Sequence, residues 1–150
     1  MTEALRRIVF RHLASKGGVV IRPEGWRAAN DVPSSWTRGG HLYRGMTEHE
    51  YKAHVRAGYI QSTGAYSHSS EGTNFADDAH EAESYVNFGR DDPRKTRRST
   101  YMIEVRNRPG VFEKWPDGYF KAQDPIPWSL VTRIWKMVGE DDAVVAYEIR

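Results

Sequence analysis

An arginine next to a glycine is the first combination in this chain that could bind a charged ligand. Residues 41–45 read His-Leu-Tyr-Arg-Gly, a short β-like segment in which Arg44 stands directly before Gly45. An arginine can clamp a pyrophosphate with paired donors, and a glycine lets a ligand approach the backbone N–H and C=O groups closely. Many folds contain such a pair, so its meaning depends on the segments that accompany it.

A second segment, residues 72–85, joins a β-like run to a helix start and a tyrosine. Apolar residues recur at helical spacing from Ala79 to Tyr85. Asp78 can cap the first turn, with Glu81 three residues later reaching back as in a capping box. The pattern predicts a strand followed by a helix. Tyr85 on that helix either faces a ligand or belongs to the core.

The two segments together resemble the first two motifs of the ADP-ribosyltransferase superfamily, which includes poly(ADP-ribose) polymerases, diphtheria-type toxins and arginine-type transferases. In the polymerase and diphtheria-toxin branch the first motif is a strand ending in His-Gly, the second reads Gly-x-Tyr-Phe-Ala-Asp, and a helical tyrosine follows the aspartate by eight residues. In the arginine branch the first strand ends in Tyr-Arg-Gly or a similar arginine pattern, and the second motif is a Ser-Thr-Ser strand. This sequence combines features of both branches. Asp77 and Tyr85 keep this interval, and Thr73 matches the Ser-Thr-Ser strand of the arginine branch. Asn74 stands where the first pattern has a tyrosine.

The resemblance implies that NAD is the substrate and that no metal is needed. Arg44 would bind phosphate or the nicotinamide ribose and take part in catalysis. Gly45 would bind the carboxamide through its backbone, Thr73 the ribose and Tyr85 the nicotinamide ring. The residues implied to bind NAD are Tyr43, Arg44, Gly45, Thr73, Asn74, Phe75 and Tyr85.

The third motif of the superfamily supplies a glutamate at the start of a strand, whose carboxylate stabilises the cationic sugar formed as nicotinamide leaves. The corresponding run here is 117–121, and the glutamate position falls on Gly118. Asp117 is the nearest carboxylate and is the implied catalytic acid. Asp124 and Gln123 are the candidates if the register is shifted.

Two functions are consistent with this pattern. The first is an NAD-dependent enzyme that cleaves the nicotinamide–ribose bond and passes ADP-ribose to an acceptor that the sequence does not identify. The second is a module without a working carboxylate, which binds NAD, ADP-ribose or a nucleic-acid end as an interaction or inhibitory protein. The pocket motifs favour the enzyme, and the missing glutamate favours the module.

Composition excludes several other chemistries. The 150-residue chain has no cysteine, so thiol nucleophiles, disulfide scaffolds and cysteine-ligated metals are absent. Its six histidines show no i,i+4 zinc-binding pattern, and it has neither a serine-hydrolase elbow nor a phosphate-cradling P-loop. No apolar run approaches the roughly 18 residues of a membrane span, and no signal-peptide pattern opens the chain. We therefore expect a cytoplasmic protein that does not enter a membrane.

One domain is expected, because 150 residues suit a single core and no composition break divides them. The resemblance implies an ADP-ribosyltransferase-like domain over 1–150, with an N-terminal helix and loop extension at 1–40 and the motif-bearing core at 41–136. The implied fold class is α+β, a split β-sandwich of two short antiparallel sheets. The expected helices are 3–15, 47–57 and 78–87, and the main later strands are 100–105, 130–135 and 143–149.

Charge patterning suggests one further partner. The net charge is +2, and a cationic loop follows the second motif, with Arg90, Arg94, Lys95, Arg97 and Arg98. A polyanion such as nucleic acid would be attracted to this loop. The alternative is a solvated connector that its own aspartates partly neutralise. Glu104, within the strand expected at 100–105, is predicted to face outward.

Overall fold

The computed structural model describes residues 22–23, 32–61, 73–82, 87–88, 98–99, 101–138 and 142–148. The elements in chain order are β1 (Arg22–Pro23), η1 (Ser34–Trp36), β2 (His41–Met46), α2 (Glu48–Ala57), β3 (Thr73–Phe75), α3 (Ala79–Ala82), β4 (Asn87–Phe88), β5 (Arg98–Ser99), β6 (Tyr101–Arg106), β7 (Glu113–Lys114), β8 (Phe120–Ala122), η2 (Trp128–Leu130), β9 (Val131–Val138) and β10 (Asp142–Glu148). Among these residues, no helix is long and apolar enough to cross a membrane.

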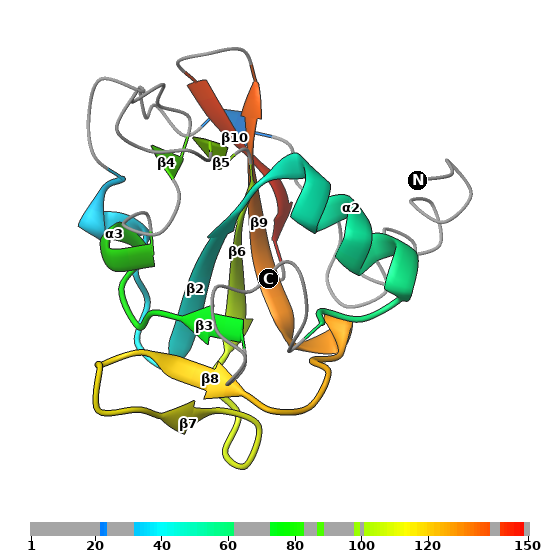
Figure 1. The fold of residues 1–150 in the computed structure, drawn as a ribbon. Coiled ribbons are helices and arrows are strands. Elements are labelled where there is room, and N and C mark those ends of the chain that lie inside the picture. The colour runs from blue at the N-terminus through cyan, green and yellow to red at the C-terminus, as the bar shows by residue number, and fades with distance from the viewer. Residues whose placement is uncertain are drawn as a thin grey trace.

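Two antiparallel sheets form the framework of the molecule. The larger has five strands in the order β1-β10-β9-β6-β2, and the smaller has three in the order β3-β8-β7. Strands β4 and β5 form a separate short parallel pair that lies close to β2. In Figure 1 the long strands run up the middle, with α2 to their right, α3 to their left and the small sheet below. The expected mixture of helices and small antiparallel sheets is confirmed.

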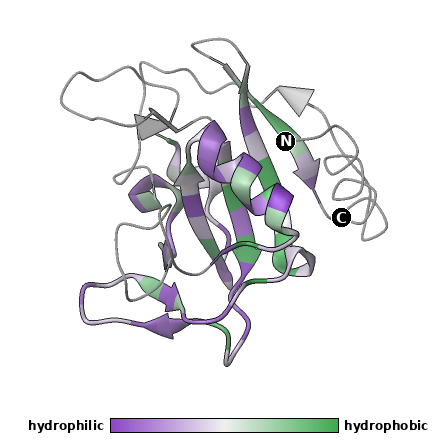
Figure 2. Cartoon of the chain, turned by 45° about the vertical axis from the view of Figure 1, so that its right-hand side comes forward, coloured by the Kyte–Doolittle hydropathy of each residue, from purple (hydrophilic) through white to green (hydrophobic). Residues whose placement is uncertain are grey.

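The five-stranded sheet is buried on both faces, and the two faces have separate cores. The α2-side core contains Leu42, Met46, Tyr51, Val55, Ile60, Phe75, Tyr101, Ile103, Val105, Ala122, Ile126, Trp128, Leu130, Val131, Ile134 and Tyr147. The η1-side core contains Val32, Trp36, Tyr43, Ala76, Ala79, Ala82, Met102, Trp135, Met137, Ala143 and Val145. The side chains of successive strand residues therefore pack into opposite cores, because side chains alternate between the two faces of a strand. Figure 2 shows the hydrophobic residues concentrated in these strands.

Helix α2 has both of its predicted end signals. The Thr47 side chain accepts a hydrogen bond from the backbone N–H of Glu50, which caps the N-terminus. Gly58 ends the helix with φ of 84°, and its N–H donates to His54 and Val55 carbonyl oxygens. The helix packs Tyr51 against the sheet, stacked on Tyr101 with ring centroids 3.9 Å apart. The expected helix at 47–57 is confirmed.

A bulge in β9 changes the direction of its side chains. Glu104 on β6 pairs with Arg133, but Val105 pairs with Val131, so one residue of β9 is extra at this point. Thr132 is that residue, and its hydroxyl donates to the Glu104 carboxylate at 2.7 Å. The bulge brings two consecutive β9 side chains, those of Thr132 and Arg133, to the same partner.

The bounds of the other predicted strands and helices agree with the structure to different degrees. The β-like runs expected at 41–45 and at the start of segment 72–85 correspond to β2 and β3, and the strands expected at 100–105 and 143–149 correspond to β6 and β10. The strand expected at 130–135 is β9, which begins at Val131 after the 3-10 turn η2 and extends to Val138. Of the helix expected at 78–87 the structure describes α3, and the expected end at 87 is wrong, because Asn87 belongs to strand β4. The helix expected at 3–15 lies outside the described residues.

The β7–β8 hairpin explains the glycine at the third motif. Its turn is closed by a hydrogen bond from Gly118 N–H to the Trp115 oxygen, with Pro116 at the second turn position. Gly118 has a φ of 91°, in the left-handed region that favours glycine. A glutamate at this position would be strained, so the local backbone accounts for the residue type there.

Candidate functional site

The three segments predicted to carry motifs meet on neighbouring strands. Tyr43 of β2 and Ala76, just after β3, exchange backbone hydrogen bonds of 2.7 and 2.9 Å. Strand β3 then pairs with β8, where Asn74 lies opposite Lys121. Residues 43–45, 73–75 and the last two residues of the third motif, 120–121, therefore lie along three adjacent strands, whereas Asp117 and Gly118 of that motif lie in the β7–β8 turn.

Most of the predicted binding residues are buried at this junction. Tyr43, Arg44, Gly45, Asn74 and Phe75 are all buried. Phe75 has no exposed surface and packs edge-on against Phe112, with ring centroids 5.3 Å apart. For Thr73 only the backbone is described, opposite Ala122. Tyr85 and the cationic residues of 90–97 lie outside the described residues, so the expectation that Arg44 and Tyr85 share a cleft stays a prediction.

Arg44 belongs to a buried group that we call the Glu50 cluster, formed by Arg44, Glu50 and His54. The Arg44 guanidinium donates to both Glu50 oxygens, from Nε at 2.7 Å and from Nη2 at 2.8 Å. Its Nη1 donates to the backbone oxygen of Asn74 at 3.0 Å. All three guanidinium nitrogens are thus engaged, and the side chain ties β2 to both α2 and β3.

His54 completes this cluster from the next turn of α2. Its Nδ1 accepts the backbone N–H of Gln61 at 3.0 Å, so the proton is on Nε2, which lies 3.1 Å from Glu50 Oε2. Burial raises the pKa of Glu50, but the charge of Arg44 and the hydrogen bonds from His54 and Arg44 outweigh it and lower the pKa to about 2. The carboxylate is ionised and fully used as an acceptor at neutral pH.

A second buried group, the Glu104 cluster, occupies the opposite face of the sheet. It consists of Arg38, Tyr43, Glu104, Thr132 and Arg133. The Tyr43 hydroxyl donates to Glu104 Oε2 at 2.7 Å, and Arg133 Nε lies 3.1 Å from both carboxylate oxygens. Arg38 also forms an ion pair with Glu104, and its side chain is 42% exposed. The cluster therefore reaches the surface at Arg38.

Glu104 itself has no exposed surface, which makes the expectation of an outward-facing residue wrong. The reason is that the sheet has no solvent face here, because η1 and α3 cover the side to which Glu104 points. Burial raises its pKa, but the hydrogen bonds from Arg133, Arg38 and Tyr43 outweigh it and lower the pKa to about 2. Burial and the bond to Glu104 also raise the pKa of Tyr43 to about 12, so Tyr43 remains a donor.

Stacked aromatic rings hold the Glu104 cluster in position. The Arg133 guanidinium lies over the Trp135 ring, 4.4 Å from its centroid. Trp36 stacks on Trp135, with centroids 4.7 Å apart and planes 6° from parallel. The Trp36 carbonyl also accepts a hydrogen bond from Arg133 Nη2. Because guanidinium and two indoles form one stack, η1 is fixed to the sheet through the same residue that neutralises Glu104.

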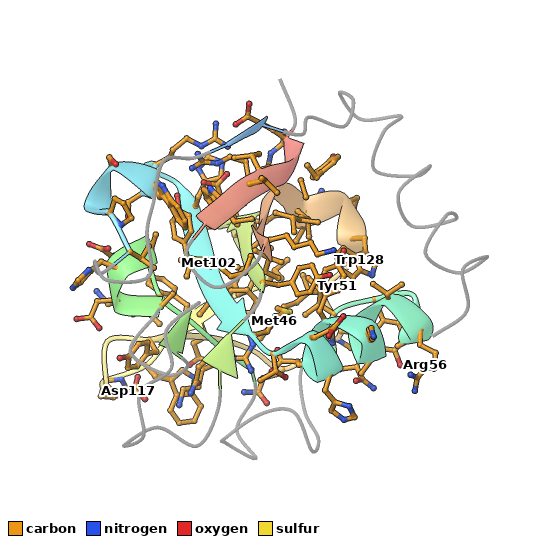
Figure 3. All side chains as sticks on the ribbon, turned by 90° about the horizontal axis from the view of Figure 1, so that it is seen from above. Met46, Tyr51, Arg56, Met102, Asp117 and Trp128 are labelled. Carbon is orange, nitrogen blue, oxygen red and sulfur yellow. The ribbon has the colours of Figure 1, made fainter. Side chains whose placement is uncertain are left out.

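The predicted catalytic carboxylate lies at the surface. Asp117 is in the β7–β8 turn, where its Oδ1 accepts the backbone N–H of Tyr119 at 2.9 Å. Its Oδ2 is 3.1 Å from Lys121 Nζ, and the Asp117 side chain is 46% exposed. The Tyr119 N–H and Lys121 lower the pKa of Asp117. Figure 3 shows Asp117 at the periphery, far from Tyr51 and Met46 in the interior. The alternatives Gln123 and Asp124 are also exposed.

Sequence reasoning missed the two buried carboxylates, and only one of them had a local signal. Glu50 and His54 are four residues apart on α2, beside the apolar Tyr51 and Val55, which places them toward the buried side of the helix. Glu104 had no comparable signal, because its partners come from the segment after η1, from β2 and from the bulge of β9. Neither carboxylate is a proton acceptor at neutral pH, so both clusters are interpreted as structural.

The remaining features of the site concern metals and cavities. Among the described residues, no group of three or more histidine or acidic side chains could hold a metal ion. A cavity of about 640 Å³ lies at the start of β2, and none of the residues predicted to bind NAD lines it.

Comparison of the chain with protein-family models, curated proteins and solved structures found no significant match.

Proposed function

We propose that the chain is an ADP-ribosyltransferase-like domain whose two antiparallel sheets form the split β-sandwich of that fold. In this proposal NAD binds where β2, β3 and β8 adjoin, the nicotinamide–ribose bond is cleaved, and ADP-ribose passes to an acceptor. Gly45 binds the carboxamide, Thr73 the ribose and Tyr85 the nicotinamide ring. Asp117 stabilises the positive charge that grows on the ribose as nicotinamide leaves.

The observation that carries the proposal is the adjacency of the motif segments. The backbone hydrogen bonds between Tyr43 and Ala76, together with the β3–β8 pairing, join three segments that a resemblance in sequence had connected. Three residues separate β3 from α3, and the N–H of the second residue of α3, His80, donates to Asp78 Oδ1 at 2.8 Å. This strand-to-helix order is the one expected of the second motif.

A module that binds without catalysis is the second candidate, and specific contacts favour it. Arg44 is held by Glu50 and the Asn74 carbonyl, so it would have to leave a buried carboxylate in order to bind phosphate. Asp117 is paired with Lys121 on an exposed turn. Since an ion-paired, solvated carboxylate stabilises a developing cation less than a desolvated one, catalysis would need this turn to rearrange.

Nicotinamide release separates the two candidates. The protein is incubated with NAD, free nicotinamide is measured by chromatography, and NAD binding is measured in parallel by calorimetry. The enzyme releases nicotinamide, whereas the binding module binds NAD and releases none. Absence of NAD binding would overturn both candidates.

Matched aspartate variants then identify the catalytic carboxylate. Asp117→Asn keeps an oxygen that can accept the Tyr119 N–H, so the turn is retained while the charge is lost. We expect nicotinamide release to fall about a hundredfold with NAD binding nearly unchanged, because the loss falls on the transition state. Asp124→Asn is the control, since Asp124 is also exposed and should have a mild effect. The reverse result would mean that the register of the third motif is shifted.

A further inference from the structure

A cavity lies at one end of the five-stranded sheet, between three segments of the chain. Its volume is about 640 Å³, within the range of small-molecule sites. The start of β2, the end of β6 and the 3-10 turn η2 surround it. The lining residues are Gly39, Gly40, His41, Arg106, Asn107, Arg108, Pro109, Ser129 and Leu130.

The charged groups in this lining are all basic. Arg106 and Arg108 are exposed, and within the described part of the chain neither makes an ion pair. No aspartate or glutamate is among the lining residues. Two guanidinium groups and a histidine therefore share one cavity without a carboxylate in its wall. Such a lining favours an anionic ligand, because positive charge in a pocket wall attracts anions.

The wall also offers uncharged donors and a small apolar surface. The side-chain amide of Asn107 and the hydroxyl of Ser129 can donate hydrogen bonds. His41 Nδ1 donates to the Gly39 carbonyl oxygen at 2.9 Å, which leaves Nε2 for another partner. Nε2 can donate to an anion in the protonated form of the imidazole. Pro109 and Leu130 supply the apolar part. This combination suits an anion attached to a compact organic group.

The backbone around the cavity is fixed before any ligand arrives. His41 pairs with Arg106 in the β2–β6 ladder, and Asn107 N–H donates to the Gly40 oxygen at 2.9 Å. Beyond the strand, Arg108 N–H donates to the Arg106 oxygen at 2.9 Å. The two arginines are therefore carried by a hydrogen-bonded turn at the end of a strand, which lowers the ordering cost of binding.

We propose that this cavity binds a phosphate monoester of a small organic molecule. The planar guanidinium groups of Arg106 and Arg108 hold the phosphate oxygens with paired N–H donors, and His41, Asn107 and Ser129 supply further contacts. A single phosphate fits better than a nucleic-acid strand, because the two arginines stand together at the end of β6 and just beyond it, and do not form a stripe along the surface.

Calorimetric titration with ribose 5-phosphate at low ionic strength tests the proposal. Wild type should bind ribose 5-phosphate and should not bind ribose. Arg106→Gln and Arg108→Gln should each weaken binding roughly tenfold or more, since each removes charge-assisted hydrogen bonds. Arg56→Gln is the matched control, because Arg56 is exposed on α2 at the edge of the molecule, and its affinity should stay within about twofold of wild type.

The variants are expected to fold, since both target arginines are exposed, and their circular dichroism melting curves should match that of wild type. The His41 imidazole signals should shift in NMR spectra on addition of ribose 5-phosphate and not on addition of ribose. Failure of wild type to bind, or equal binding by Arg56→Gln and Arg108→Gln, would overturn the proposal. So would an oligonucleotide without a terminal phosphate that binds the same arginines more tightly than ribose 5-phosphate. None of these results depends on NAD binding.

Discussion

Glu104 shows how far one buried carboxylate organises its surroundings. Its partners come from the segment after η1, from β2 and from β9, and two of them also contact a further group: Tyr43 accepts the Arg38 N–H at 2.6 Å, and Arg133 stacks on Trp135. A charge in this position costs free energy unless it is paired. Its pairing therefore determines where the segment before β2 lies against the sheet.

Replacing Glu104 by glutamine should strongly destabilise the protein. Glutamine has nearly the same shape, but it leaves the buried Arg133 without its counter-charge and turns one accepting oxygen into a donor. We expect the free energy of unfolding to fall by about 3–5 kcal/mol in urea titration. Glu113→Gln is the control, because Glu113 is exposed on β7, and it should change stability by less than about 0.5 kcal/mol. Equal effects of the two variants would mean that the Glu104 contacts are weak.

At the scale of elements, local sequence signals were sufficient to predict the bounds of α2, but they predicted little else of the candidate site. Thr47 and Gly58 mark the ends of that helix by interactions within a few residues, so the sequence alone could locate it. The motif strands could also be located, because each has a β-like run near a turn. The bulge at Thr132 could not, since an extra residue in one strand is defined only by its partner strand.

The orientation of buried polar side chains was equally inaccessible from the sequence. Alternation along β6 predicts one solvated face and places Glu104 on it. Covering both faces of the sheet removes that face, and the cover comes from η1, α2 and α3, which lie far away in the chain. The pairing of Arg44 with Glu50 instead of a ligand likewise depends on how α2 folds back on β2.

The C-terminal cap of α2 gives a prediction at this scale. Gly58 has a φ of 84°, and alanine there would have to adopt the left-handed conformation. Gly58→Ala should lower the free energy of unfolding by roughly 1–2 kcal/mol. Gly39→Ala is the matched control, because Gly39 has no positive φ and a Cβ there meets nothing within 4 Å. Thermal melting of both variants checks the prediction, and a Gly39 variant as unstable as the Gly58 variant would contradict it.

At the scale of the whole molecule, the two charged clusters stabilise the sheet from opposite faces. The Glu50 cluster fastens α2 and β3 to β2 on one face, and the Glu104 cluster fastens η1 to β6 and β9 on the other. Tyr43 and Arg44, consecutive residues of β2, are members of different clusters because neighbouring side chains point to opposite faces. Side chains on both faces of β2 therefore bind buried carboxylates, Arg44 to Glu50 and Tyr43 to Glu104.

Acid unfolding should report both carboxylates at once. Their pKa values are lowered from 4.5 to about 2 in the folded protein. A lowered folded-state pKa stabilises the protein above the unfolded-state pKa, and this stabilisation is lost as the pH falls from about 4.5 to about 2. Each carboxylate contributes roughly 3 kcal/mol to the free energy of unfolding that is lost over this pH range. The free energy of unfolding should therefore be nearly flat from pH 7 to 5.5 and then decline steeply.

Urea titrations at a series of pH values in wild type and Glu104→Gln measure this decline. The variant begins from a lower stability at pH 7, but it has one titrating carboxylate fewer, so its free energy of unfolding should fall by roughly 3 kcal/mol less between pH 5.5 and pH 2. Glu113→Gln should keep the wild-type slope. Parallel slopes in wild type and Glu104→Gln would show that Glu104 does not titrate below its unfolded-state value, and the interpretation of its cluster as a fixed ionic centre would then fail.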